Sequence, residues 1–301
     1  MTVRAFLIAT AVFSAACCAR GDVLVSTWNM KWFPSGRADL RSGAESEAAT
    51  LSSAAGIVAG AIADQTRRSP ADIVFFAQEM RDAECCTNLV AAVGVRDLRV
   101  AAVSCFTDNG GVPLWQQVAI MTTLPVITSG YAVWSNAEVQ IPRGFAYALL
   151  DAGPDARIAC FSIHLKSNFS RESSEVERQK NIYKRESAAS QILAVVRGLG
   201  EKYGDKKLMV LVGGDFNTSE DDLAYVSEST LRSFYGAHFR SGFRDLKKHQ
   251  RITHPAANGY PAATLDYILY RGFERIVGRK IYPAGGVSDH NLVALRLAIA
   301  R

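Results

Sequence analysis

The chain has 301 residues, of which 49% are hydrophobic and 21% are charged. A chain of this length can bury a large core, and the composition is that of a globular protein, not of a disordered chain. The formal net charge of +5 is compatible with a polyanionic partner but is too small to indicate one by itself.

The N-terminus has the pattern of an export signal. Arg4 precedes a short apolar run over residues 5–13, and small residues follow up to Ala19. The run is too short to span a bilayer and matches a cleaved signal peptide better than a buried strand. We therefore expect a signal peptide over residues 1–19 and a single secreted or periplasmic domain over 20–301. Lipid attachment at Cys17 is the less favoured alternative.

Four cysteines would remain after cleavage, and exported chains can form disulfides. We predict that Cys105 pairs with Cys85 or Cys86. Cys160 lies in a strand-like apolar run and is most simply a buried apolar group.

The first half of the chain alternates between strand and helix patterns. Residues 22–29 read as a strand, and residues 44–67 carry apolar side chains near helical spacing, which predicts a surface helix. The next predicted elements are a buried strand (73–77), a helix (87–93) and two strands (98–105 and 117–121).

The second half continues in the same way and contains no repeat or low-complexity tract. Predicted strands lie near Val133 and over 144–150, 157–163, 208–212, 264–270 and 287–297, and a charged helix lies within 172–201. The pattern predicts one domain of mixed strands and helices.

The most informative stretch is Leu208 to Thr218. Its apolar run predicts a strand buried on both faces, and we expect Gly213 and Gly214 to turn the chain there. Asp215 and Asn217 would then stand at the mouth of a rigid strand. Five strands begin or end in polar residues of this kind, namely Asn29, Glu79, His164, Asp215 with Asn217, and Asp289 with His290.

Six short motifs together resemble the endonuclease/exonuclease/phosphatase superfamily with the deoxyribonuclease I-like fold. They are Trp28-Asn29, Gln78-Glu79, His164-Leu165, Gly214-Asp-Phe-Asn217, Leu265-Asp-Tyr-Ile268 and Ser288-Asp-His290, in the family's order along the chain. The resemblance implies an α/β fold, a four-layer α/β/β/α sandwich with the site at one end of its sheets. It also implies metal-dependent hydrolysis of phosphoester bonds.

The metal ligands implied by the resemblance are Asn29, Glu79 and Asp289. Carboxylate and amide oxygens suit Mg²⁺, or Mn²⁺ or Ca²⁺ in its place, and the ion would neutralise charge on phosphoryl oxygens.

Three further histidines match no motif and are expected to be surface residues, namely His238, His249 and His254.

The catalytic roles also follow from the resemblance. His290 would be the general base for water, with Asp266 orienting it. Asp266 lies inside a strand, where a buried carboxylate needs a partner. His164 would contact phosphate or protonate the leaving group, Asp215 would position the water, and Asn217 would donate to a phosphate oxygen. The family's glutamate behind the first histidine is replaced here by Gln116 or Gln117, which could offer only a neutral hydrogen bond.

Nucleic acid is the favoured substrate, DNA before RNA. Gln78 to Asp82 is similar to the segment of deoxyribonuclease I whose arginine enters the minor groove, which gives that role to Arg81. Arg143 and Lys166 could contact phosphates. A cluster along the charged helix is either a further phosphate contact or a solvated face, namely Arg178, Lys180, Lys184 and Arg185.

Two alternatives remain open. A sphingomyelinase-type lipid phosphodiesterase, or a phosphatase of the same fold, would need exposed apolar loops to enter a bilayer, and the only short candidate, residues 131–134, reads better as a strand. A catalytically inactive binding module is disfavoured because every motif residue is present. We expect a monomer with no stable protein partner and no transmembrane segment.

Overall fold

A computed structural model describes residues 21–36, 43–135, 138–168, 174–256 and 261–299. The expected signal peptide, residues 1–19, lies outside the described residues.

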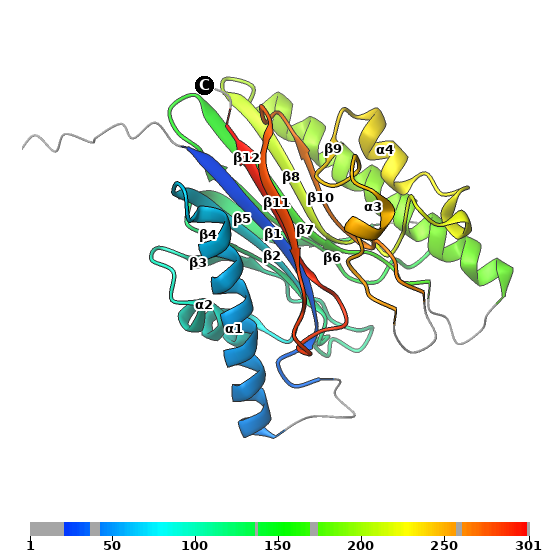
Figure 1. Cartoon of the computed structure of the whole chain (residues 1–301). Coiled ribbons are helices and arrows are strands. Elements are labelled where there is room, and N and C mark those ends of the chain that lie inside the picture. Colours follow the sequence, from blue (N-terminus) through cyan, green and yellow to red (C-terminus); the bar gives the residue numbers. More distant parts are fainter. Residues whose placement is uncertain (1–20, 37–42, 136–137, 169–173, 257–260, 300–301) are drawn as a thin grey trace, which may run out of the picture.

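Two six-stranded sheets form the centre of the protein (Figure 1). The first has the order β11-β12-β1-β2-β4-β3 and the second β5-β6-β7-β8-β10-β9. The first comprises β1 (Asp22–Phe33), β2 (Ala71–Met80), β3 (Arg99–Val103), β4 (Gln117–Thr122), β11 (Ile276–Tyr282) and β12 (Leu292–Ala298). The second comprises β5 (Val126–Val133), β6 (Gly144–Asp151), β7 (Ala156–His164), β8 (Lys207–Asp215), β9 (Arg240–Ser241) and β10 (Asp266–Arg271).

Each sheet contains one parallel pair in an otherwise antiparallel arrangement. β1 runs parallel to β2, and β7 runs parallel to β8. The carboxyl ends of a parallel pair meet at the same edge of a sheet. The segments after these four strands are therefore brought together in two pairs.

Helices cover the outer face of each sheet (Figure 1). The helices α1 (Ala44–Thr66) and α2 (Ala83–Val93) pack on the first sheet, and α3 (Glu175–Lys202) and α4 (Thr230–Gly236) pack on the second. Two short 3₁₀ helices, η2 (Leu223–Tyr225) and η3 (Lys248–Gln250), lie in the connections.

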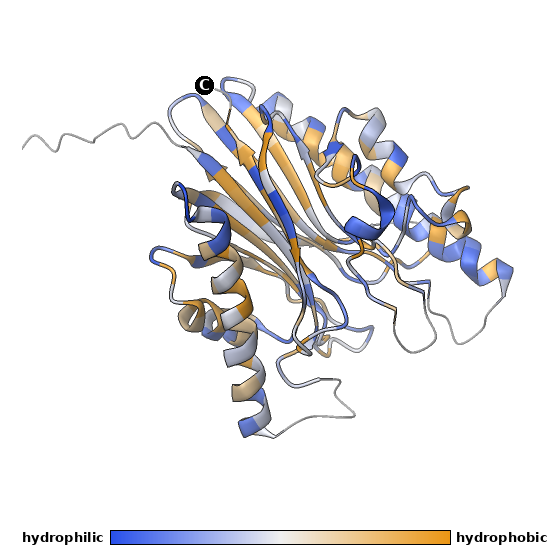
Figure 2. Ribbon diagram, in the orientation of Figure 1, coloured by the Kyte–Doolittle hydropathy of each residue, from blue (hydrophilic) through white to orange (hydrophobic). Residues whose placement is uncertain are grey.

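Alternation along the strands builds three apolar layers. Val23 and Val25 face the second sheet in the central core, whereas Leu24 faces α1 and α2. The third layer lies between the second sheet and the helices α3 and α4. Successive residues of a strand point to opposite faces, so a strand apolar on both faces serves two cores. The strands in Figure 2 are accordingly coloured mostly as hydrophobic. The four-layer α/β/β/α sandwich is thus confirmed.

Gly213 and Gly214 do not turn the chain, so that expectation was wrong. Strand β8 runs through both glycines to Asp215. A Cβ on Gly213 would lie 2.1 Å from Phe76 Cδ2 on the facing sheet, and one on Gly214 would lie 1.9 Å from the carbonyl oxygen of Ile163. The two glycines therefore allow β8 to approach its neighbours closely.

The predicted disulfide is also wrong. The four cysteines are free thiols. Asp82 caps α2 by accepting the amide N–H of Cys85 at 2.8 Å, so the helix begins earlier than expected. This start turns Cys85 and Cys86 into the core between helix and sheet, while Cys105 is exposed. Cys160 is buried between the sheets, as predicted.

Helix α1 is long and apolar enough to cross a membrane by length and composition alone. Its buried residues, which include Ala54, Val58 and Ile62, pack against the first sheet. Most of its other residues are exposed or partly exposed, so α1 is a surface helix that packs one face on the sheet, as predicted.

Candidate active site

The strand ends surround a cavity of about 840 Å³. It lies where β1, β2, β7 and β8 end and where β10 and β12 begin. Nine of the eleven predicted site residues line it, namely Asn29, Glu79, Arg143, His164, Lys166, Asp215, Asn217, Asp289 and His290. Asp266 lies behind His290, and Arg81 is absent from the lining.

His290 and Asp266 form a buried pair at one side of this cavity. His290 Nδ1 lies 2.8 Å from Asp266 Oδ2. Burial opposes the charge, but the carboxylates of Asp266 and Asp215 raise the pKa of His290 to about 10. The Thr253 hydroxyl accepts the amide N–H of Asp266 at 3.0 Å, which fixes the start of β10. The predicted contact between the two side chains is present.

The motif residue Trp28 hydrogen-bonds to the backbone of His290. The Trp28 indole N–H donates to the carbonyl oxygen of His290 at 2.7 Å. The Ser288 hydroxyl donates to the carbonyl oxygen of Asn29 at 2.7 Å and accepts the His290 amide N–H at 3.0 Å. Strand β1 thus fixes the backbone of the proposed base.

Asp215 occupies the centre of the site. Its Oδ2 accepts from Asn29 Nδ2 at 3.0 Å, and its Oδ1 accepts the Asn217 amide N–H at 2.8 Å. The same Oδ2 lies 3.6 Å from His164 Nε2 and 3.9 Å from His290 Nε2. Burial raises the pKa of Asp215 to about 7. Both predicted histidines are therefore grouped around this carboxyl.

His164 has no supporting partner on Nδ1 among the described residues. Gln117 binds the β3–β4 connection, where its Oε1 accepts from the Ser104 hydroxyl at 2.7 Å, and Gln116 Oε1 accepts from Arg143 at 2.7 Å. Neither glutamine therefore offers His164 even the neutral hydrogen bond that was open to it. Burial and the charge of Arg143 hold the pKa of His164 well below its ordinary value. A lowered pKa favours the neutral imidazole, in which one ring nitrogen carries a proton and the other does not.

The buried carboxylate of Glu79 is suited to binding a cation. Its carboxylate accepts the Trp32 amide N–H at 3.0 Å and lies 3.7 Å from the neutral His164. Burial raises the pKa of the Glu79 carboxyl, which a bound cation would reverse.

The other two predicted ligands have partners of their own. Asn29 Oδ1 accepts the Lys31 amide N–H at 3.1 Å, so its Nδ2 faces Glu79. Asp289 lies 3.1 Å from Lys31 Nζ. The oxygens of Glu79, Asn29 and Asp289 suit a hard divalent ion. Binding it would require the Asn29 amide to rotate its oxygen toward the ion and Asp289 to separate from Lys31.

A second carboxylate group, Asp215, Asp266 and His290, has ligand atoms within 4.8 Å of one another. In this group His290 Nδ1 is already hydrogen-bonded to Asp266, an arrangement in which the carboxylate orients the imidazole. This group is better suited to proton transfer.

Backbone strain is concentrated at the cavity. Of the seven non-glycine residues with positive φ in the described chain, five line it, and only Asp97 and His238 do not. Each such conformation costs about 1–3 kcal/mol and persists where the surroundings enforce it. The five are Lys31, Trp32, Glu79, Arg143 and Asn217.

The predicted phosphate contacts divide into two groups. Arg143 and Lys166 line the cavity together with Lys31. Arg81 does not, because its guanidinium lies 3.0 Å from both oxygens of Glu47 and 2.9 Å from Asp82. A minor-groove role for Arg81 is therefore not supported by its position.

The charged cluster on α3 behaves mostly as a solvated face. Arg178 pairs with Glu175 at 2.6 Å, and Lys180 lies 3.7 Å from Glu177. Arg185 is instead fully buried and bonded to Glu228 at 2.6 Å, so it is no phosphate contact.

Several residues of the cavity wall belong to no sequence motif. His254, expected on the surface, lines the cavity with its ring centroid 4.9 Å from that of His290. Trp32 and Tyr225 line it as well. His254 is placed by pairing of its backbone with Ala263, a contact that no motif encodes.

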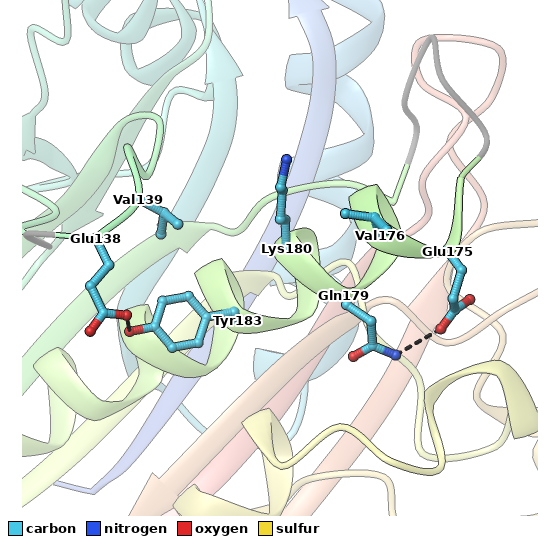
Figure 3. A pocket seen from close by; sticks show the side chains of 7 residues that line it. All are labelled: Glu138, Val139, Glu175, Val176, Gln179, Lys180 and Tyr183. Atoms are coloured by element: carbon cyan, nitrogen blue, oxygen red, sulfur yellow. Dashed lines mark hydrogen bonds between the residues drawn. The ribbon is translucent and has the colours of Figure 1, made fainter.

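A second hollow, about 450 Å³, lies on α3 (Figure 3). Its polar groups bond one another across the surface. Tyr183 donates to Glu138 at 2.8 Å, and Gln179 donates to Glu175 at 2.8 Å. The proposed chemistry belongs to the first cavity.

Comparisons with known proteins agree with this geometry. The model of the Endonuclease/Exonuclease/phosphatase family matches residues 26–290. No curated protein sequence matches the chain. TDP2 from Caenorhabditis elegans has a TM-score of 0.59 and 13% identity over 92% of this chain and 74% of that one.

Two further solved structures are similar to the same extent. An endonuclease/exonuclease/phosphatase from Beutenbergia cavernae DSM 12333 gives a TM-score of 0.60 and 15% identity over 93% and 72% of the two chains. TDP2 from D. rerio gives 0.58 and 16% over 92% and 98%. Members of the matched family hydrolyse phosphoester bonds and generally depend on divalent metals. The chain therefore belongs to the endonuclease/exonuclease/phosphatase family.

Proposed function

We propose that this protein is an exported, divalent-metal-dependent phosphodiesterase that cleaves nucleic acid, with DNA as the first expectation. One observation carries the proposal. The buried His290–Asp266 pair and His164 meet at Asp215, in the cavity that Glu79 lines. Export rests on the N-terminal pattern of residues 1–19.

The side chains divide the work between a proton acceptor and hydrogen-bond donors. His290 Nε2 takes the proton of the attacking water, and Asp266 stabilises the imidazolium that forms. The water oxygen bonds to phosphorus as the bond to the leaving oxygen breaks, and the leaving oxygen takes up a proton from solvent. Asp215 accepts a hydrogen bond from that water and orients it. His164, which is neutral, donates to a phosphate oxygen.

Glu79, Asn29 and Asp289 would hold the metal ion, with Mg²⁺ as the first candidate. When bound, the ion would neutralise charge on the phosphoryl oxygens. His290 must be neutral to accept a proton, and a cation at Glu79 would favour that form.

Nucleic acid is supported by the cations and by one structural relative. Lys31, Arg143 and Lys166 line the cavity, and phosphate contacts of this kind dominate nucleic-acid binding. The D. rerio TDP2 structure holds a single-strand DNA product.

A lipid phosphodiester is the second candidate, and an apolar rim favours it. Strand β5 contains residues 131–133, which removes the loop once considered for membrane entry. Leu223 is 86% exposed and Val226 is 68% exposed, and their segment also supplies Asp222 and Tyr225 to the cavity wall. Exposed apolar side chains beside a phosphoester site could enter a bilayer.

One assay separates these functions. The purified protein is incubated with plasmid DNA, RNA and sphingomyelin vesicles, with Mg²⁺ and then with EDTA. We expect nicking of plasmid that EDTA abolishes. Cleavage of sphingomyelin alone would refute the nuclease proposal, and turnover of none of the three would favour a binding module.

A further inference from the structure

We infer that the cavity binds unpaired nucleic acid, with Trp32 and Tyr225 as the surfaces on which bases stack. This inference rests on the proposed function and specifies its substrate as a single strand. It comes from two aromatic rings and three cations that the six motifs did not include.

Trp32 is held in the cavity wall by a strained bulge of β1. The register of β1 against β2 shifts between Asn29 and Phe33, and Lys31 and Trp32 have φ values of 48° and 55°. Their amide N–H groups donate to Asn29 and Glu79. These bonds enforce the backbone conformation at Trp32, a half-buried residue of the cavity wall whose amide is bonded to the proposed metal ligand Glu79.

Tyr225 is held by a buried network behind the wall. Its side chain hydrogen-bonds to Asn168, and the Arg185 guanidinium lies 5.8 Å from the ring centroid. Arg185 donates to Asn168 Oδ1 at 2.7 Å and to the Lys166 carbonyl oxygen at 2.8 Å. Glu228 holds Arg185 through both carboxylate oxygens. The ring is therefore oriented before any substrate binds, which lowers the entropic cost of stacking.

Only an unpaired strand can use both rings. In a duplex the faces of the bases are stacked on one another, so a ring inside a cavity cannot reach them unless the base is extruded. Aromatic platforms combined with cations along the backbone are the pattern of single-strand binding. Here the cations are Lys31, Arg143 and Lys166, all in the cavity wall. Arg81, which could have entered a minor groove, is bonded to Glu47 and Asp82.

Binding tests this inference separately from cleavage. A fluorescent single-stranded oligonucleotide with hydrolysis-resistant phosphorothioate linkages is titrated with the protein in Mg²⁺, and its anisotropy is recorded. The same sequence as a blunt duplex and an all-abasic strand of equal length serve as comparisons. We expect the single strand to bind at least about tenfold more tightly than either, because base stacking is the difference.

Substitutions assign the effect to the two rings. Trp32→Ala and Tyr225→Ala should each weaken single-strand binding by about 5- to 150-fold and leave the abasic strand unchanged. Trp32→Phe and Tyr225→Phe keep a ring and should stay near wild type. Tyr183→Ala is the matched control, since Tyr183 lines the separate hollow on α3 (Figure 3).

Three outcomes would overturn the inference. They are duplex binding as tight as single-strand binding, single-strand binding that neither alanine variant weakens, and binding to sphingomyelin vesicles without binding to any oligonucleotide. A protein that binds the single strand through both rings but cleaves no phosphodiester would support the inference and refute the proposed function.

Discussion

Two buried ion pairs of this protein differ in how completely they are satisfied. Arg185 donates four hydrogen bonds, two to Glu228 and one each to Lys166 and Asn168, and Glu228 also accepts from Thr230. The His290–Asp266 pair is less complete. Asp266 Oδ1 has no partner among the described residues.

The difference separates a structural pair from a reactive one. Buried polar atoms are ordinarily hydrogen-bonded, because leaving one unpaired costs about 1–3 kcal/mol. Within the described chain, His164 Nδ1 and Arg143 Nε in the cavity wall and Asp266 Oδ1 behind His290 nevertheless have no partner. The reactive pair thus keeps an unpaired oxygen, whereas both carboxylate oxygens of Glu228 are bonded.

The largest effect is expected at the reactive pair. His290→Ala should lower the rate of phosphodiester hydrolysis by about 10²–10⁴-fold, because a general base contributes that much. The protein should still fold, which circular dichroism would check, although loss of the buried pair with Asp266 lowers its stability. Residual activity above about 1% of wild type would argue against the base role.

At the structural pair the loss should be in stability. Glu228→Gln leaves the Arg185 charge uncompensated in a fully buried position. The free energy of unfolding, measured with urea, should fall by about 3–5 kcal/mol. Glu177→Gln is the control, because its pair with Lys180 is solvent-exposed and should contribute less than about 1 kcal/mol. Equal losses of unfolding free energy in Glu228→Gln and Glu177→Gln would show that the buried pair is no more important for stability than the exposed one.

Gly213→Ala tests the close contact beneath the site. The added methyl group would meet Phe76 at 2.1 Å, and such overpacking costs about 1–3 kcal/mol. Phe76→Leu in the same background should recover part of the loss. Gly200→Ala, on α3 with open space around it, should be neutral or slightly stabilising. A Gly213→Ala protein as stable as wild type would contradict the packing.

Stability should depend on pH through His290. Its pKa is raised to about 10 in the folded, metal-free protein, against an ordinary value of 6.5. The stabilisation of the fold by protonated His290 is therefore complete below pH 6.5. It is lost as pH rises toward 10, by up to about 1.4 kcal/mol per pH unit. Urea unfolding in EDTA at pH 6.5, 8 and 9.5 measures it. Asp266→Asn should flatten the dependence, and an unchanged slope would exclude Asp266 as its cause.

The smallest effect is expected at Arg81. Because Arg81 is bonded to Glu47 and Asp82, Arg81→Ala should leave the salt dependence of DNA binding unchanged. Lys166→Ala should reduce the slope of log K against log salt by about 0.7–0.9. A comparable fall in Arg81→Ala would restore Arg81 to the interface.

Local pattern was enough for most of the fold. The apolar runs predicted the strands, and the helical spacing of Leu51, Val58 and Ile62 predicted α1, because burial follows the period of each element. Besides the two short 3₁₀ helices, three elements were missed, namely β9, β11 and α4. The exposed edge strand β11 has no alternation, and α4 is too short to show a helical period.

The order of six polar motifs at strand ends was enough to gather most of the site, since parallel strands end together. The contacts that several other residues make could not be predicted from the motifs. The glycines of β8 depend on Phe76 and Ile163, Arg81 on Glu47, and Arg185 on Glu228. The order of the motifs along the chain was therefore sufficient to predict which chemistry gathers at the strand ends. It could not predict which charges are already neutralised or which rings and cations remain at the cavity, because those contacts join residues far apart in the chain.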